Sequence, residues 1–262
     1  MAINQALVTP VAIRARRRIA RRLVPYLFLL YVIAFLDRVN VSYAALDMTK
    51  DLKFTPEIYG FGTGIFFAGY FLLEIPGTLL VENWSARKWI ARILISWGFV
   101  AALTGFIQTP RQFYLIRFFL GCAEAGFFPG IIVYVTHWFR GQDRGRAIAY
   151  FIAAAPLSNI IGSPISGLLL GVHWLGKAGW RWVFMIEGVP AVILGVVTLF
   201  YLTDWPHQAR WLPPDERDWI TSELEQERRD MKSVRSLRVW QALKQPEVLL
   251  LVAGYFLIQI SV

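Results

Sequence analysis

The amino-acid sequence predicts an all-α membrane protein: a bundle of six transmembrane helices, followed by the start of a seventh. The first observation is composition. Of the 262 residues, 56% are hydrophobic and only 17% are charged, whereas a soluble domain carries about 25% charged residues. The second is that the apolar residues gather in long blocks, each with roughly the 20 residues that a helix needs to cross a ~30 Å hydrocarbon core. The third is that basic residues gather between these blocks.

The first apolar block, residues 25–46, follows the basic stretch RARRRIARR. It would form about 33 Å of helix, whereas a secretory signal has a shorter apolar core. We therefore interpret it as a retained first helix. The six predicted spans are residues 25–46, 58–81, 89–108, 112–138, 147–171 and 183–203.

The remaining segments complete the predicted organisation. Residues 1–24 form a basic N-terminal segment, and residues 204–246 form a polar segment between two bundles. Residues 247–262 begin a seventh apolar helix, whose 15 residues from about Val248 reach only about 22 Å, short of the membrane thickness. We therefore expect the chain to be a fragment or a truncated product.

The distribution of lysine and arginine predicts the orientation. With the N-terminus in the cytosol, the cytosolic segments hold twenty basic residues and the external loops hold five. Cytosolic loops carry the excess of positive charge in membrane proteins. We expect a multi-pass protein of the cell (inner) membrane. The net charge of +9 is accounted for in this way, so no nucleic-acid partner is predicted.

Small residues recur at the spacing that lets helix backbones approach closely. The pairs are Gly60 and Gly64, Gly126 and Gly130, and Gly167 and Gly171. We expect them at helix contacts.

The first and fourth predicted spans each carry one acid and one arginine: Asp37 and Arg38 in the first, Arg117 and Glu124 in the fourth. A charge at mid-membrane costs about 2.5–3.5 kcal/mol on insertion scales and usually marks a functional site. Six spans can form two three-helix repeats, which makes the first and fourth equivalent. Glu74 and Glu187 lie nearer helix ends, where water or a loop could satisfy them, so for these two a functional and a structural role stay equally open.

Asp37 and Arg38 are sequence neighbours, so they point about 100° apart and each needs a partner elsewhere. Two arginines facing one cavity would bind an organic anion, because a guanidinium donates two parallel hydrogen bonds to a carboxylate. Carboxylates in the same apolar surroundings could take up and release a proton. The alternative is a purely structural salt-bridge network.

The stretches FLDRVNVSYAALDM, RFFLGCAEAGFFPGIIVYVTHWF, RGRAIAYF, GSPISG and GWRWVFMIEGVPAVILG together resemble the anion–cation symporter branch of the major facilitator superfamily, which contains tartrate, galactonate and phthalate permeases. The resemblance runs from about residue 17 to residue 262. It implies the N-terminal half of a twelve-helix transporter, monomeric when complete, that imports organic anions with protons by alternating access.

The resemblance also implies roles for individual residues. Arg38, Arg117 and Tyr70 would bind the substrate, and Asp37 and Glu124 would couple transport to protons. A polar substrate contact of the fifth helix falls near Ala155, which cannot make it, so the exact substrate stays open.

A gating loop between the second and third helices would use an acid and two bases. In GTLLVENWSARK these are Glu82, Arg87 and Lys88. Asn83 and Ser85 replace the usual base and glycine, and ordinary positive-inside charge explains the two bases equally well.

Other functional classes of protein match the sequence less well. A membrane-embedded enzyme would have to use His137 in THWFRGQD, but the spacing from His137 to Asp143 does not match that of membrane acyltransferases, and there is no G-x-S-x-G or H-E-x-x-H motif. The single cysteine excludes an intrachain disulfide and a cysteine metal site, and no cofactor is predicted. A truncated, non-transporting remnant or sensor remains a further alternative.

Overall fold

The computed structural model describes residues 10–232, 245–250 and 253, without the side chains of residues 82, 83, 231 and 232. The chain divides into two compact units, Met1–Thr221 and Ser222–Val262, and each is described by itself. In the second unit, Gln226 donates a side-chain hydrogen bond to Asp230 at 2.9 Å. Most of the predicted seventh helix, residues 247–262, lies outside the described residues.

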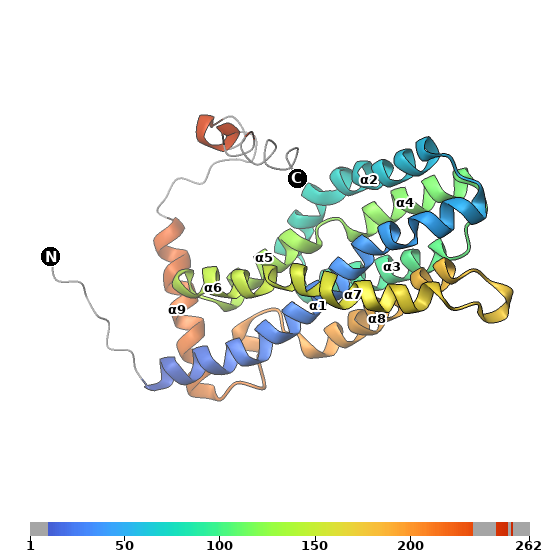
Figure 1. Cartoon of the computed structure of the whole chain (residues 1–262). Coiled ribbons are helices and arrows are strands. Elements are labelled where there is room, and N and C mark those ends of the chain that lie inside the picture. The colour runs from blue at the N-terminus through green and yellow to red at the C-terminus, as the bar shows by residue number, and fades with distance from the viewer. Residues whose placement is uncertain (1–9, 233–244, 251–252, 254–262) are drawn as a thin grey trace. The chain divides into compact units, whose positions relative to one another are not determined.

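Within its described residues the first unit consists of helices joined by short connections, without any strand (Figure 1). The all-α prediction is therefore confirmed. The α-helices are α1 (Pro10–Leu52), α2 (Pro56–Asn83), α3 (Ala86–Thr104), α4 (Pro110–Glu124), α5 (Phe127–Trp138), α6 (Gly141–Ile152), α7 (Ala154–Leu170), α8 (Gly179–Tyr201) and α9 (Pro214–Lys232), the last of which continues into the second unit.

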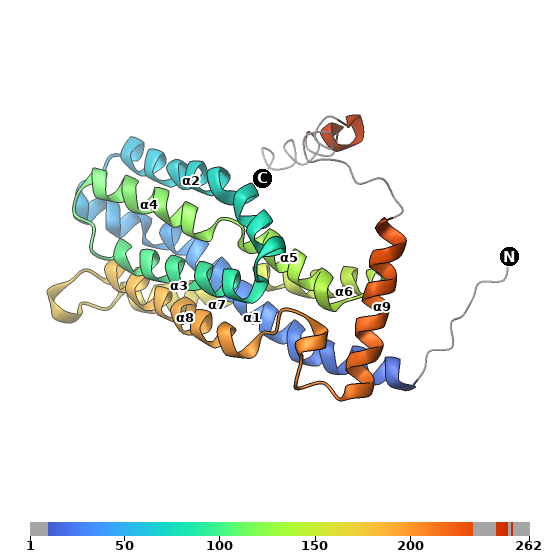
Figure 2. The same cartoon turned by 180° about the vertical axis from the view of Figure 1, so that it is seen from behind.

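Five helical stretches among the described residues are long and apolar enough to span a membrane, and they match five of the six predicted spans. These are Pro10–Leu52, Pro56–Val81, Pro110–Trp138, Gly141–Leu170 and Gly179–Tyr201. The remaining prediction, residues 89–108, corresponds to α3, whose first turns carry Arg87, Lys88 and Arg92 and make it less apolar. At 19 residues, α3 is still about 28 Å long, and it packs closely against α8 (Figure 2).

Helix α1 is much longer than the predicted first span. Its 43 residues form a helix of about 65 Å, twice the hydrocarbon thickness. Much of the predicted N-terminal segment 1–24 is thus a helical extension of the span. Arg18 on this extension donates to the buried carboxylate of Glu216 in the first turn of α9, at 2.8 and 3.3 Å.

Two predicted spans, residues 112–138 and 147–171, are interrupted by helix breaks. The break between α4 and α5 falls at Gly126, which has a positive φ of +80°. A Cβ atom there would lie 3.2 Å from the backbone of Gly77 on α2, so glycine meets both the backbone angle and the close approach. This break ends α4 directly after Glu124. The other break, at Ala153, separates α6 from α7.

Several of the glycines that were predicted from their spacing to lie at helix contacts do not lie there. Other glycines allow the helices to pack closely. An added Cβ at Gly60, Gly64 or Gly167 would meet nothing within 4 Å among the described residues, so in this part of the chain the expectation of a helix contact is wrong for these three glycines. Gly121 of α4 instead lies against the Phe66 carbonyl of α2, and Gly98 of α3 against the Gly188 carbonyl of α8. These close approaches determine which helices pair.

We expect Gly121→Ala to destabilise the bundle, because the new methyl group would overlap with the Phe66 carbonyl oxygen. Overpacking of this kind costs about 1–3 kcal/mol in the free energy of unfolding. The measurement is the thermal unfolding midpoint of the purified protein in detergent. Gly64→Ala on α2, where the methyl group meets open space, is the matched control. Equal midpoints for the two variants would contradict the α2–α4 pairing.

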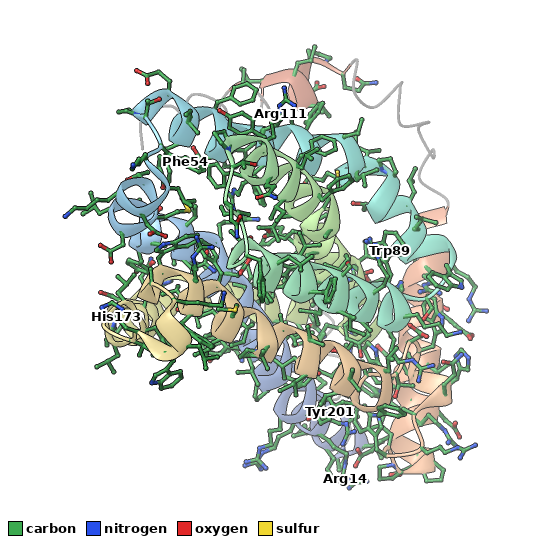
Figure 3. All side chains as sticks on the ribbon, turned by 90° about the vertical axis from the view of Figure 1, so that its right-hand side faces the viewer. Arg14, Phe54, Trp89, Arg111, His173 and Tyr201 are labelled. Atoms are coloured by element: carbon green, nitrogen blue, oxygen red, sulfur yellow. The ribbon has the colours of Figure 1, made fainter. Side chains whose placement is uncertain are left out.

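The two ends of the bundle are closed by different contacts. Figure 3 is viewed from the end that holds the α1–α2, α3–α4 and α7–α8 connections, marked by Phe54, Arg111 and His173. At this end Arg181 donates to the carbonyls of Gly105 and Ile107 at 3.1 and 2.8 Å. At the opposite end Trp138 and Tyr134 both donate to the Thr203 carbonyl at 3.0 Å.

Candidate functional site

Asp37 and Arg38, adjacent in the middle of α1, turn toward different neighbours. The carboxylate of Asp37 is buried and faces α3, where the indole Nε1 of Trp97 donates to Oδ2 at 2.5 Å. Asn40, one turn further along α1, donates its amide to Oδ1 at 3.0 Å. Both carboxylate oxygens therefore have a hydrogen-bond donor.

Arg38 turns toward α2 and α4. Its guanidinium forms an ion pair with Glu124, the last residue of α4, and lies over the ring of Tyr70 at 5.4 Å from the centroid. The Arg38 side chain is 39% exposed, whereas that of Glu124 is only 4% exposed. The base of this pair therefore remains accessible while the acid does not. The structure thus brings together Arg38, Glu124 and Tyr70.

Arg117 reaches the same region from the middle of α4. It is buried, with its guanidinium carbon 4.7 Å from the centre of the Phe66 ring, and the Arg38 guanidinium lies 6.0 Å from the same ring. The Nε atom of Arg117 is buried without a hydrogen-bond partner among the described residues. Phe66, which sequence reasoning missed, therefore positions both arginines through their attraction to its ring face.

The charges on the two sides of α1 belong to one electrostatic network. Arg117 interacts electrostatically with Asp37, Glu124 and Arg38. Glu187 on α8 interacts with Asp37 and accepts a hydrogen bond from the Ser166 hydroxyl of α7 at 2.7 Å. Among the described residues, six helices contribute polar or aromatic side chains to this network, namely α1, α2, α3, α4, α7 and α8. The residue from α3 is Trp97.

The predicted gating loop is tied to the end of α8. Asp204 accepts hydrogen bonds from the Arg87 backbone N–H and the Ser85 hydroxyl, each at 2.8 Å. Lys88 is exposed, with its ammonium 5.9 Å from the centre of the Trp84 ring, and the side chain of Glu82 lies outside the described part of the chain. The acid that holds Arg87 is thus Asp204, 117 residues away in sequence, which no local pattern could indicate.

The remaining candidates lie away from this network or at its edge. The ring of His137 stacks on Trp205 at 3.9 Å, and Asp143 forms an ion pair with Arg16. Ala155 on α7 and Glu74 on α2 are both partly buried. Among the described residues, no three His, Cys, Asp or Glu side chains are grouped to bind a metal.

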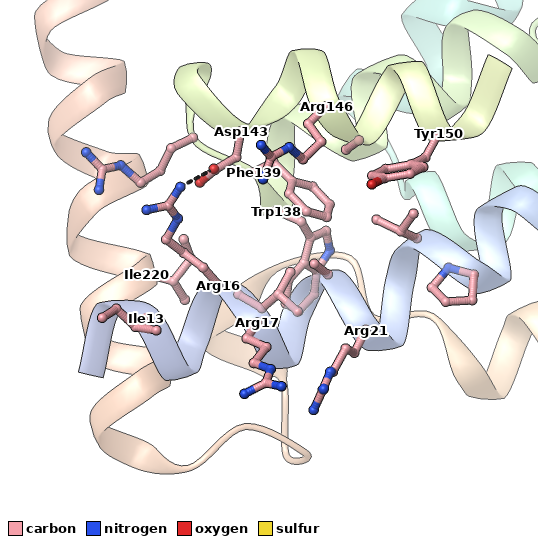
Figure 4. A pocket seen from close by; sticks show the side chains of 16 residues that line it. Ile13, Arg16, Arg17, Arg21, Trp138, Phe139, Asp143, Arg146, Tyr150 and Ile220 are labelled. Carbon is pink, nitrogen blue, oxygen red and sulfur yellow. Dashed lines mark hydrogen bonds and ion pairs between the residues drawn. The ribbon is translucent and has the colours of Figure 1, made fainter. Parts of the chain in front are cut away.

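A cavity of about 470 Å³ lies where α1 begins, close to the start of α6 (Figure 4). Its lining combines basic side chains, including Arg16, Arg17 and Arg146, with the aromatic rings of Trp138 and Tyr150. None of the intramembrane charges lines it. It is separate from the charged network around the middle of α1.

Comparison with known proteins shows which family the chain belongs to. The family model described as Major Facilitator Superfamily matches residues 27–262. The chain belongs to this superfamily. The predicted superfamily is therefore confirmed, and the fold and relatives are those of membrane transporters rather than enzymes.

Two relatives are similar over much of the chain. One, described as "Putative tartrate transporter" from Agrobacterium vitis, is 51% identical over 244 residues, which cover 93% of this chain and 56% of the relative. The other, described as "Putative metabolite transport protein NicT" from Pseudomonas putida, is 44% identical over 79% of this chain and 48% of its own length. This chain therefore spans about half the length of these superfamily members.

The fold is also similar to a solved structure. A bacterial homologue of the human lysosomal transporter Spinster, in an inward-facing and unoccupied conformation, has a TM-score of 0.64 at 19% identity. The similarity covers 74% of this chain and 44% of the solved one. At this identity it shows the superfamily fold alone, in a multi-pass membrane protein.

Proposed function

We propose that the complete product of this gene is a secondary transporter that carries a small organic anion, such as a dicarboxylate or sugar acid, across the inner membrane together with protons. The observation that carries the proposal is the convergence of Arg38 and Arg117, from different helices, on the ring of Phe66. The similarity to a protein described as a tartrate transporter supports the class of substrate.

Substrate binding would use the two arginines and Tyr70. The Nε of Arg117 has no hydrogen-bond partner among the described residues, so this guanidinium has a donor to offer to an incoming carboxylate. Arg38 is partly exposed and its guanidinium lies over the ring of Tyr70. The hydroxyl of Tyr70 could donate a hydrogen bond to the same anion. A dicarboxylate could bind one arginine with each of its ends.

Proton coupling would use Glu124 and Asp37. Glu124 holds Arg38 in an ion pair, so a substrate carboxylate must compete with it for the guanidinium. A proton on Glu124 would neutralise this acid, release Arg38 and favour substrate binding. Binding of proton and anion would thereby be linked, as symport requires. Asp37 would take part through its electrostatic interaction with Arg117.

Alternating access would require a second helical half. Helices α2 and α7 present several exposed apolar side chains, among them Phe67 and Phe71 of α2 and Ile160 and Leu168 of α7, and a second half would cover this kind of surface. With the N-terminus in the cytosol, the contact between Arg87 and Asp204 lies at the cytosolic end. Its opening and closing would gate the inner side, with Glu82 and Lys88 as further members of the loop.

The test is uptake of radiolabelled tartrate by proteoliposomes that contain the purified complete gene product. We expect accumulation when the exterior is acidified, and a loss of accumulation when a protonophore removes the pH gradient. Uptake that a sodium gradient drives and a pH gradient does not would contradict proton coupling. Absence of both uptake and binding for tartrate and related sugar acids would overturn the proposed substrate class and favour a remnant or sensor.

A further inference from the structure

Glu187 is an acid buried between α8 and α7, with a relative exposure of 8%. Its Oε1 accepts a hydrogen bond from the Ser166 hydroxyl at 2.7 Å. Its Oε2 is buried and has no hydrogen-bond partner among the described residues. The neighbouring acid Asp37 differs, because both of its oxygens accept hydrogen bonds.

Neither α7 nor α3, which pack against α8, carries a basic side chain at the height of Glu187 along the bundle. Helix α7 contains no charged residue, and the bases of α3, namely Arg87, Lys88 and Arg92, lie in its first two turns. Glu187 instead lies next to Gly188, which packs against Gly98 further along α3. From α1, the charged side chain that acts on Glu187 is Asp37, another acid.

The buried network therefore holds more acids than bases. Its carboxylates are Asp37, Glu124 and Glu187, and its guanidiniums are Arg38 and Arg117. Glu124 is paired with Arg38, and Arg117 interacts with both Asp37 and Glu124. An ionised carboxylate without a compensating charge is costly in an apolar interior, and such a group usually takes up a proton instead.

We propose that Glu187 is an additional proton-binding site of the transporter, which takes up a proton and exchanges it during the transport cycle. The exchange of this proton during transport rests on the proposed function. The protonation of Glu187 does not, because it is inferred from the burial and contacts of this side chain. The proton would reside on the free Oε2 of Glu187 when Asp37 is ionised.

The variant Glu187→Gln separates a proton site from a structural role. Glutamine has the same shape, and its carbonyl oxygen can still accept the hydrogen bond from Ser166, but it cannot bind a proton. Ser166→Ala removes the hydrogen bond and leaves the acid in place. Glu57→Gln, in the exposed first turn of α2, is the matched control for a glutamate outside the network.

The first measurement is the infrared band of protonated carboxyl groups in the reconstituted complete protein, which does not depend on transport. We expect one protonated carboxyl in the wild type that is lost in Glu187→Gln and retained in Glu57→Gln. An unchanged band in Glu187→Gln would overturn the proposal, even if wild-type uptake is proton-driven.

The second measurement is the number of protons transported per substrate, obtained from the membrane potential that just prevents net uptake. We expect Glu187→Gln to lower this number by one, while the Kd for tartrate stays within about twofold of the wild type. Ser166→Ala should keep the wild-type number. If the wild type itself fails to take up tartrate, the proposed function fails, and the infrared result alone decides whether Glu187 binds a proton. An unchanged number in an active Glu187→Gln variant would assign Glu187 a structural role.

Discussion

Replacement of Arg117 by alanine is expected to weaken tartrate binding by about 100-fold, equivalent to about 2.7 kcal/mol, and to abolish uptake. Arg117 is a buried cation inside the bundle, held against the Phe66 ring at 4.7 Å, with its Nε unpartnered among the described residues. Loss of this group would leave a substrate carboxylate in an apolar interior without its compensating charge, which is strongly unfavourable. The measurement is isothermal titration of the purified protein with tartrate, followed by uptake in proteoliposomes.

Two further variants make this expectation specific. Arg117→Lys keeps the charge but loses the planar fork that binds both carboxylate oxygens, so we expect binding weaker than the wild type and stronger than Arg117→Ala. Arg111→Ala, in the exposed first turn of the same helix (Figure 3), should bind tartrate like the wild type. Wild-type affinity in Arg117→Ala, in a protein that remains monodisperse, would remove Arg117 from the binding site.

Asp37→Asn is expected to eliminate accumulation of substrate against its gradient while leaving exchange of substrate across the membrane. The asparagine side chain has the same shape but cannot take up a proton, so a coupling role would be lost and a binding pocket preserved. Its amide nitrogen would face one of the two donors that hold Asp37, Trp97 or Asn40. A mismatched buried donor costs about 1–3 kcal/mol, so a lower unfolding temperature should accompany the change.

The readouts are uptake driven by a pH gradient and counterflow of labelled against unlabelled substrate in the same proteoliposomes. Asp47→Asn, an exposed acid further along α1, should leave both unchanged. Accumulation at the wild-type level in Asp37→Asn would show that Asp37 does not carry the coupling proton. Loss of both uptake and counterflow would show a role in binding or folding instead.

The helices could be predicted from sequence because the signal is local. A block of apolar residues long enough to cross a membrane forms a helix wherever the block lies, and each of the six predicted spans coincides with helix in the structure. The breaks within the helices were harder to predict from the sequence. The interruption at Gly126 depends on a close approach to Gly77, 49 positions earlier in the chain, and nothing in its immediate sequence distinguishes it from the glycines that meet open space.

The charged residues illustrate the same limit. That Asp37 and Arg38 point in different directions follows from helix geometry alone. That Trp97 and Asn40 hold the acid, while Glu124, Tyr70 and Phe66 surround the base, depends on which helices lie on each side of α1. Phe66 itself looks like one apolar residue among many in its span, and only the approach of two guanidiniums to its ring gives it significance.

The sequence by itself determined the class of protein, the approximate positions of its membrane-spanning segments, and which charged residues must find partners inside the membrane, because each of these follows from hydrophobicity and helix period along the chain. Only the tertiary structure decided which partner each charge receives, which glycines bring helices together, and that the buried Glu187 accepts its hydrogen bond from Ser166 of α7, a helix without charged residues. Those outcomes depend on contacts between residues distant in sequence, whose energies arise only when the helices are packed together.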